Sequence, residues 1–338
     1  MVEVASSVTR VRRVTAQRPA LAGLVLGGLG VVVFSGSFPA TKFALHDLSP
    51  WFVSFGRAAV AAALAAAALA ALRRTRPSRS EFGRLVIAAL GVVIASPLLA
   101  ALALETTPSA HVAVVFALLP AVTAAFAVLR GGERPGAVFW IAALAGVALV
   151  TAFALRQSHG GITLADGYLL LAVLACGVGY SEGAVVARTL GGLETICWAL
   201  VICLPLTLAG SIISAPAAMP STDAVLGFLY VAVFSMFIGF VLWYAGLARG
   251  IARVSQLQLF QPLLTVALSA LLLDEHVGWL TALTALGVIA SVAVTQVSRV
   301  RKVHDASASH TSARPRPLPA AATRASEDRA PPAAGSRA

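Results

Sequence analysis

Glu182 is the strongest candidate for chemistry in this sequence, because it lies inside a long apolar segment, in Gly179-Tyr180-Ser181-Glu182-Gly183. An ionisable group in such surroundings is costly and commonly faces a cavity or a partner of opposite charge. Glu182 could therefore bind a proton or a cationic group of a ligand. The alternative is that its side chain bends toward the end of its helix near Arg188, only ~9 Å away by helical rise.

Five further residues are candidates for contact with a ligand. Gln258 and Gln261 are three positions apart and share one face of a helix. Their amides donate and accept hydrogen bonds, which suits a polar neutral or zwitterionic ligand, although such amides also join helices to one another. Ser37, Tyr180 and Trp243 complete the set, and Trp243 is alternatively an anchor at a membrane interface.

Three other titratable residues have two interpretations each. His111, close in sequence to Glu105, could relay protons, but a solvated loop histidine is the favoured interpretation. Lys42 and Arg57 could attract anions, and the slightly favoured alternative is that each extends its charge to the nearer membrane surface. Proton coupling is therefore assigned to Glu182 and His111 as a hypothesis.

Sequence signatures of enzymes are missing from the chain. It has no Gly-rich loop followed by Lys-Ser or Lys-Thr, which argues against ATP hydrolysis. It has no His, Asp and Glu spacing typical of a metal site, and Cys176, Cys197 and Cys203 show no metal or redox spacing. We therefore expect no catalytic residue, no bound metal and no cofactor.

The composition identifies the solvent of this chain as lipid. The chain is 59% hydrophobic and 12% charged, whereas a soluble domain has about 25% charged residues. Because a helix satisfies its own backbone in lipid, we predict an all-α integral membrane protein. Apolar runs of about 20 residues, long enough to cross a bilayer, predict ten transmembrane helices at 21–41, 50–72, 84–104, 109–130, 137–155, 167–188, 194–214, 224–246, 252–273 and 278–298.

Basic residues between these runs predict the orientation. With residues 1–20 in the cytoplasm, 17 Lys and Arg flank the runs on the cytoplasmic side, and the other side has only Lys42, Arg57 and Arg156. Basic residues concentrate in cytoplasmic loops, so both termini should be cytoplasmic. The tail 303–338, rich in Ala, Pro, Ser and Arg, is predicted to be disordered. The net charge of +11 is spread in short clusters, which argues against nucleic acid as a partner.

A gapless repeat divides the chain into two halves, 21–155 and 167–298. A shift of 142 residues, the separation of positions 120 and 262, aligns ten identical residues, namely Ala110, Val112, Pro120, Thr123, Ala125, Leu129, Glu133, Gly136, Ala143 and Leu144 with Ala252, Val254, Pro262, Thr265, Ala267, Leu271, Glu275, Gly278, Ala285 and Leu286. Each half holds five spans, and this odd number turns the second half upside down relative to the first.

Two of the repeated pairs have predicted structural roles. Pro120 and Pro262 lie within their spans, where a proline removes a backbone donor and kinks a helix. Kinks at corresponding places would widen a central cavity, and the alternative is a structural kink without ligand contact. Glu133 and Glu275 follow the ends of their spans, so we interpret them as helix caps or loop contacts.

Several motifs occur in a characteristic order over residues 21–298. They are Phe34-Ser35-Gly36-Ser37-Phe38-Pro39-Ala40-Thr41-Lys42, then Arg57, then Leu119-Pro120 with Gly132-Glu133-Arg134, and finally Gln261-Pro262 with Asp274-Glu275-His276. In this order the chain resembles the EamA-type members of the drug/metabolite transporter superfamily. Members often have Trp-Gly near Phe34, and Arg or Lys where this chain has His276. The resemblance implies transport of amino acids, sugars, nucleosides, drugs or other metabolites.

We therefore predict a secondary active transporter of the bacterial inner membrane that moves a small metabolite, an amino acid-like compound or a drug outward by alternating access. An integral-membrane enzyme that processes lipids or isoprenoids is one alternative, although the usual cluster of Asp, His or Arg is missing. A membrane scaffold or sensor is another. The expected partners are the small-molecule substrate and the lipid bilayer, and a homodimer is left open.

Overall fold

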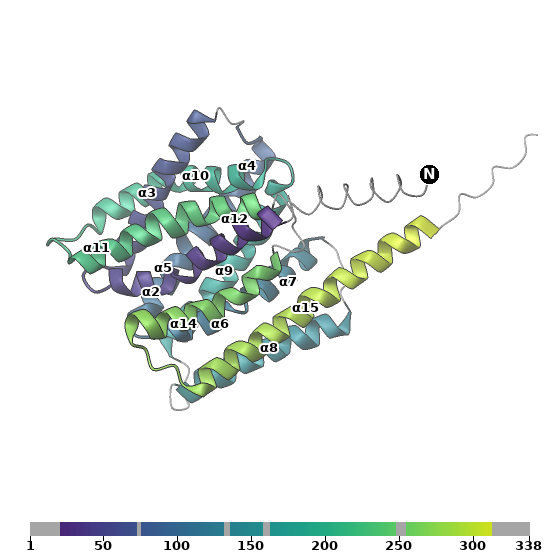
Figure 1. Cartoon of the computed structure of the whole chain (residues 1–338). Coiled ribbons are helices and arrows are strands. Elements are labelled where there is room, and N and C mark those ends of the chain that lie inside the picture. Colours follow the sequence, from purple (N-terminus) through teal and green to yellow (C-terminus); the bar gives the residue numbers. More distant parts are fainter. Residues whose placement is uncertain (1–20, 73–75, 132–135, 158–162, 248–254, 313–338) are drawn as a thin grey trace, which may run out of the picture.

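The protein is a bundle of helices (Figure 1). A computed structural model describes residues 21–72, 76–131, 136–157, 163–247 and 255–312. Every regular element within these residues is a helix. In the described part of the chain, eight helices are long and apolar enough to cross a membrane, and two shorter apolar helices, Leu257–Leu273 and Trp279–Val294, follow them. The chain is therefore an all-helical membrane protein.

The helices of the first half begin with helical residues 21–35. They continue with α2 (Ser37–Ala44), α3 (Pro50–Ala71), α4 (Arg79–Ala88), the π-helix η1 (Ala89–Ala95), α5 (Ser96–Leu104), α6 (Ser109–Phe116), α7 (Leu119–Gly131) and α8 (Ala137–Gln157). Capping residues fix some of the helix starts. The Ser49 hydroxyl accepts from the Phe52 N–H before α3, and the Ser78 hydroxyl accepts from the Glu81 N–H before α4.

The second half has a series of helices that corresponds to that of the first half. They are α9 (Leu164–Ala187), α10 (Gly192–Ile213), α11 (Thr222–Leu229), the π-helix η2 (Tyr230–Gly239), α12 (Phe240–Leu247), the 3₁₀-helix η3 (Ser255–Phe260), α14 (Gln261–Leu273) and α15 (Trp279–Ser312). Helix bounds recur at the separation of 142 residues found in the sequence. The shift carries the bounds of α3 onto 192–213 and those of α7 onto 261–273, which are the bounds of α10 and α14.

Two spans are interrupted beside a proline. Residues 117 and 118 form a turn between α6 and α7, and Pro120 lies in the first turn of α7. At the corresponding place η3 changes to α14, and Pro262 lies in its first turn. Proline fits the first turn of a helix, where its missing N–H is not needed, better than the interior. The predicted kinks are therefore breaks, and each proline begins a new helical segment.

Corresponding helices of the two halves pack on each other. α3 lies against α10, and the ring of Phe55, near the start of α3, covers Gly210, near the end of α10. α8 lies against α15 (Figure 1), where the Ser291 hydroxyl donates to the Ala142 carbonyl. Small residues at such contacts let two helices approach closely in a membrane.

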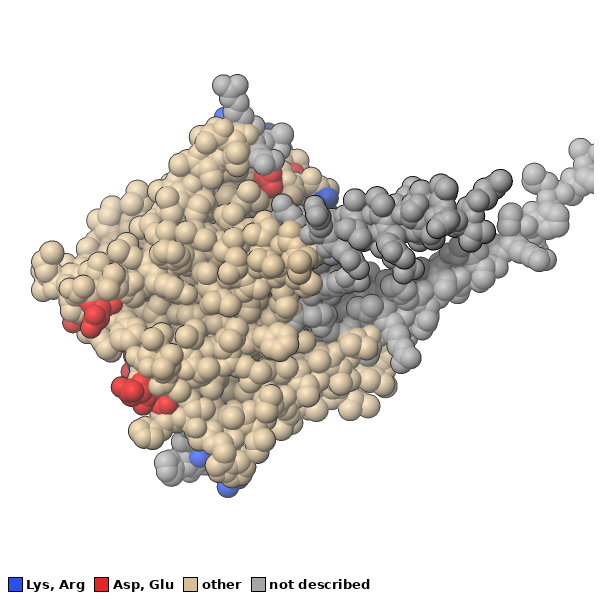
Figure 2. Space-filling view, viewed as in Figure 1, with Lys and Arg blue, Asp and Glu red and all other residues tan. Residues whose placement is uncertain are grey.

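The surface of the bundle is apolar over most of its area. Leu144 is 66% exposed and Ile213 is 86% exposed. Figure 2 shows one face whose middle carries no charged residue and whose Asp, Glu, Lys and Arg lie near its edges. A broad exposed apolar surface with charges at its edges is what a lipid environment requires.

The predicted C-terminal tail differs from the structure. α15 extends to Ser312, so residues 303–312 are helical where the sequence predicts disorder. Extending an existing helix avoids the cost of nucleation, which is the unfavourable step in helix formation. Residues 313–338, the basic segment 1–20 and Glu133 lie outside the described residues.

Candidate functional site

A cavity of about 130 Å³ lies between helices of both halves. The first half contributes residues of the first span, α3, η1, α5, α6 and α7, and the second half contributes residues of α9, η2, α12, η3, α14 and α15. One water molecule needs roughly 10–15 Å³ of such volume. The cavity is therefore large enough for several waters or a small organic molecule.

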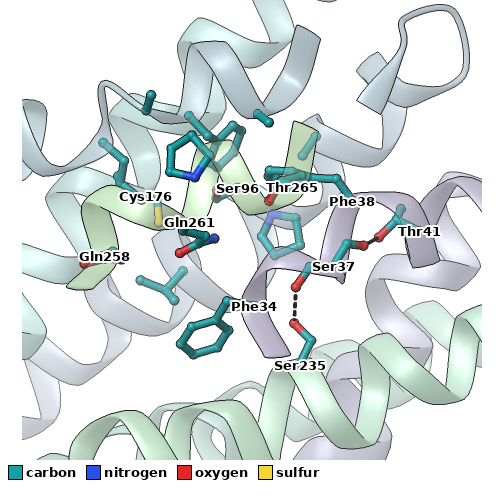
Figure 3. A pocket seen from close by; sticks show the side chains of 18 of the residues that line it. Phe34, Ser37, Phe38, Thr41, Ser96, Cys176, Ser235, Gln258, Gln261 and Thr265 are labelled. Carbon is teal, nitrogen blue, oxygen red and sulfur yellow. Dashed lines mark hydrogen bonds between the residues drawn. The ribbon is translucent and has the colours of Figure 1, made fainter. Parts of the chain in front are cut away.

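Six of the residues predicted from the sequence line this cavity. Four of them are Ser37 of α2, Tyr180 of α9, Gln258 of η3 and Gln261 of α14. Figure 3 labels Ser37, Gln258 and Gln261 around the cavity. Gln258 and Gln261 both line it, as their spacing of three residues predicts, because a 3₁₀ turn aligns positions three apart. The remaining two are the prolines.

Pro120 and Pro262 line the cavity at the two helix breaks. The residues just before each break also line the cavity, namely Ala117 before α7 and Leu259 before α14. Irregular backbone at membrane depth is tolerated where it borders a cavity rather than lipid. Both prolines thus lie beside the cavity, and their contact with a ligand stays a prediction.

The first span bends at Gly36, next to the cavity. The Tyr230 hydroxyl donates to the Val33 carbonyl at 2.9 Å, and a Cβ at Gly36 would collide with that hydroxyl. Because glycine has no Cβ, the Tyr230 hydroxyl can lie against this turn and stabilise it. The turn positions α2, whose Ser37 shares a hydrogen bond of 2.7 Å with Ser235 of η2 (Figure 3).

Arg57 of α3 also lines the cavity, and this position contradicts the favoured expectation that it extends to the membrane surface. Its Nη2 contacts the Met236 sulfur at 3.4 Å. Its Nε is buried and has no hydrogen-bond partner among the described residues. The guanidinium therefore stands at a cavity wall with one weak acceptor, since a thioether sulfur accepts poorly.

Several lining residues were not predicted from the sequence. Ser96, Cys176, Ser235 and Thr265 supply polar atoms, and the Thr265 hydroxyl is buried without a partner in the described part of the chain. Serine, threonine and cysteine also occur as ordinary packing residues in membrane helices, so their type alone gives no signal. The repeat offered one clue, because Thr265 matches Thr123.

Glu182 does not line the cavity. Its side chain is fully buried, and one carboxylate oxygen lies 2.8 Å from Arg84 Nη1 of α4. The ion pair connects α9 to α4, and binding of a cationic group of the substrate by Glu182 stays a prediction. A proton-coupling role of Glu182 stays a prediction.

His111 is buried, with 4% exposure, so the favoured interpretation of a solvated loop histidine is wrong. Its Nε2 lies 2.9 Å from Asp166 Oδ1 at the start of α9, and its ring stacks on Phe153 of α8. Glu105, its neighbour in sequence, is exposed. His111 thus joins α6 to α9 away from the cavity lining, and its role in proton coupling stays a prediction.

Trp243 and Lys42 also have other contacts than those expected. Trp243 is 9% exposed and packs with Val31 in a small apolar cluster, so it is neither a lining residue nor an exposed anchor at the interface. Lys42 is half-buried, and its ammonium donates to the carbonyls of Leu104, the last residue of α5, and of Thr107. Cations stabilise the carbonyl end of a helix, so Lys42 caps α5 instead of reaching the surface.

Glu275 caps a helix of the other half. Its carboxylate accepts hydrogen bonds from the N–H groups of Ser109 and Ala110, at 2.7 and 3.0 Å, at the start of α6. The first N–H groups of a helix have no partner within the helix, and a negative charge suits that end. The prediction of a cap is confirmed for Glu275.

Comparisons with known proteins agree with a transport role. The model of the EamA-like transporter family matches the chain twice, over residues 21–154 and 163–296. "Uncharacterized transporter YdeK" of Bacillus subtilis (strain 168) is 47% identical over 277 residues, which cover 81% of this chain and 96% of that protein. A solved structure described as "Crystal structure of protein" matches with a TM-score of 0.58 at 20% identity, covering 82% of this chain and 97% of its own, and this similarity concerns the fold alone.

Proposed function

The chain belongs to the EamA-like transporter family, and from this premise we propose that it is a secondary active transporter that exports a small metabolite, an amino acid-like compound or a drug. The observation that carries the proposal is the cavity, which both halves of the chain line with polar and aromatic side chains. A site between two repeats near the middle of the membrane is where secondary transporters bind their substrates.

We further propose ten spans in two inverted halves that alternate between access to the two membrane faces. Support comes from antiparallel contacts between corresponding helices. Phe55 near the start of α3 meets Gly210 near the end of α10, and Leu149 in α8 meets Gly287 early in α15. Inverted repeats can exchange their conformations and so expose a shared site to either face.

The bacterial inner membrane, with both termini in the cytoplasm, is the proposed location. The support is the distribution of 17 basic residues on one side of the spans against Lys42 and Arg156 on the other, since Arg57 lines the cavity. Assembly as a homodimer stays a prediction. Coupling to protons through Glu182 or His111 also stays a prediction.

The lining residues argue against the enzyme alternative. Among the described residues that line the cavity, none is Asp, Glu or His. General acid–base catalysis and metal binding depend chiefly on those side chains. A lipid-processing reaction would therefore lack its usual groups at this site.

Reconstitution tests the proposed transport. Purified full-length protein in proteoliposomes should exchange at least one labelled compound from a panel of amino acids, nucleosides and short carboxylates faster than protein-free vesicles. Ser37→Trp, which fills the cavity, should abolish the exchange, and Ser80→Trp on the exposed start of α4 should keep it. Exchange equal to that of empty vesicles for the whole panel, under pH and sodium gradients in both directions, would refute the proposal.

A further inference from the structure

Arg57 is the one charged residue among the described residues that line the cavity. From this position we infer that Arg57 binds the anionic group of the substrate, and that the substrate is a small organic anion with one carboxylate. The inference rests on the proposed transport function and names the substrate class of the same cavity. It differs from a cationic ligand bound by Glu182, which lies outside the cavity lining.

No carboxylate of the described residues pairs with Arg57. The ion pairs of this part of the chain that involve buried carboxylates or histidines are Arg84–Glu182 and His111–Asp166. The acceptor recorded for Arg57 is the Met236 sulfur, and its Nε has none within the described chain. A structural arginine in a membrane helix is normally paired with a carboxylate or with backbone carbonyls. The unused donors of Arg57 therefore point to a partner that enters from the cavity.

The chemistry of guanidinium selects the kind of partner. Its planar set of N–H donors matches a carboxylate with two parallel hydrogen bonds. One guanidinium balances one negative charge, which favours a monocarboxylate over a phosphate ester or a dicarboxylate. A cationic substrate would meet an uncompensated like charge in surroundings of low dielectric constant, where charges interact strongly.

The rest of the cavity suits the body of such a substrate. Thr265 offers a buried hydroxyl without a partner in the described part of the chain, and it can bond to a polar group of the ligand. Phe34, Phe38, Phe116 and Phe240 supply apolar walls. A volume of about 130 Å³ restricts the ligand to a small molecule. The expected substrate therefore combines one carboxylate with a short apolar or weakly polar skeleton.

Ligand binding to the purified full-length protein in detergent tests this inference. The probes are isovalerate, phenylacetate and indole-3-acetate, each compared with its primary amide and with the amine of the same skeleton. The rise in unfolding temperature with ligand concentration gives each affinity. At least one acid should bind about tenfold more tightly than its amide, as expected for a charge-assisted bidentate pair, and the amines should not bind.

Substitutions assign the effect to this guanidinium. Arg57→Gln should remove the preference for the acid over its amide, Arg57→Lys should keep part of it, and Arg156→Gln, at an exposed arginine in the last turn of α8, should leave it unchanged. If Arg57→Gln does not fold, as judged by size-exclusion chromatography, Arg57→Lys and Thr265→Val take its place, and both should weaken binding of the acid. The inference is overturned if none of the acids binds, if amides bind as tightly, or if Arg57→Gln keeps the preference for acids.

Transport of the same probes separates this inference from the proposed function. If acids bind through Arg57 but neither they nor any compound of the transport panel crosses the proteoliposome membrane, the transporter is refuted and the anion site stands. Export of neutral or cationic compounds that is unchanged in Arg57→Gln would refute the anion site and leave the transporter standing.

Discussion

Glu275 and Ser109 join the two halves of the chain, because the Glu275 carboxylate accepts hydrogen bonds from both the backbone N–H and the hydroxyl of Ser109, at 2.7 and 3.0 Å. Glu275 follows α14 in the second half, and Ser109 begins α6 in the first. The two residues are 166 positions apart in the sequence. A helix cap of this kind fixes the relative position of α6 and α14 at one end of the bundle.

Removal of this cap should destabilise the protein. Glu275→Ala should lower the free energy of unfolding by about 1–2 kcal/mol, because two N–H groups lose a charged acceptor. Glu275→Gln should cost less, since its amide oxygen still accepts. Glu105→Ala, at an exposed glutamate after α5, is the matched control and should have little effect. Thermal unfolding in detergent measures the difference, and equal losses in the alanine variants would contradict the assigned cap.

Close packing of η1 on α9 predicts opposite effects for two glycines of one span. A Cβ on Gly91 would collide with the Ala175 carbonyl oxygen and lie 3.2 Å from the Gly179 Cα, and backbone atoms cannot move aside. Gly91→Ala should therefore destabilise by about 1–3 kcal/mol. Gly83→Ala meets no atom within 4 Å and should stabilise by about 0.5–1 kcal/mol, as alanine does in a helix. Unfolding temperatures that change in the same direction would be evidence against this packing.

Asp47 should make stability depend on pH in the acid range. Its carboxylate accepts the Ser221 N–H at 2.7 Å at the start of α11, and hydrogen bonds from Ser221 lower the pKa of Asp47 below its usual value. A lowered folded-state pKa gives stability that is complete above the unfolded-state pKa, about 4, and is lost as the pH falls through the folded-state value. The unfolding temperature of the wild type should thus fall more steeply below pH 4 than that of Asp47→Asn, and identical pH profiles would remove Asp47 as the cause.

The sequence predicted the features that local chemistry determines. Proline disturbs the regular hydrogen bonding of a helix, so Pro120 and Pro262 marked the two places where a span is interrupted, although the sequence predicted kinks there and not breaks. Residues three apart share a helix face, so Gln258 and Gln261 were correctly expected to face the same way, and both line the cavity. Such inferences need only the neighbours within one turn.

Contacts between distant helices could not be predicted in the same way. Arg57 is seven positions after the start of α3, about 10 Å by helical rise, so its long side chain could have reached either the membrane surface or the interior. The contact with Met236, 179 positions away, decides this. Likewise Glu182 pairs with Arg84 across 98 positions. Helix packing selects these partners, and the sequence of one helix does not contain that information.

The Arg84–Glu182 pair should stabilise the protein only while both charges are present. Arg84→Gln removes this cation from beside the fully buried carboxylate of Glu182 and should destabilise by about 1–3 kcal/mol, less than for a completely buried pair because Arg84 is 45% exposed. The double variant Arg84→Gln with Glu182→Gln should recover much of this loss, because no charge is then left buried. A double-mutant cycle on unfolding free energies measures the coupling, and additive effects would show that the pair contributes nothing.

Cys176 offers a chemical test of the cavity, because its thiol lines the cavity whereas Cys197 and Cys203, both in α10, belong to an apolar cluster. All three are free and buried. In a protein that keeps only Cys176, a small membrane-permeant thiol reagent should react roughly tenfold faster than in a protein that keeps only Cys203, because access limits the rate at buried thiols. The added group would occupy the cavity and should inhibit exchange in proteoliposomes, and Cys176→Ala should abolish that inhibition.

A saturating carboxylate ligand should protect Cys176 but not Cys203. Equal labelling of the two single-cysteine proteins, or inhibition that persists in Cys176→Ala, would show that substrates do not pass through this cavity.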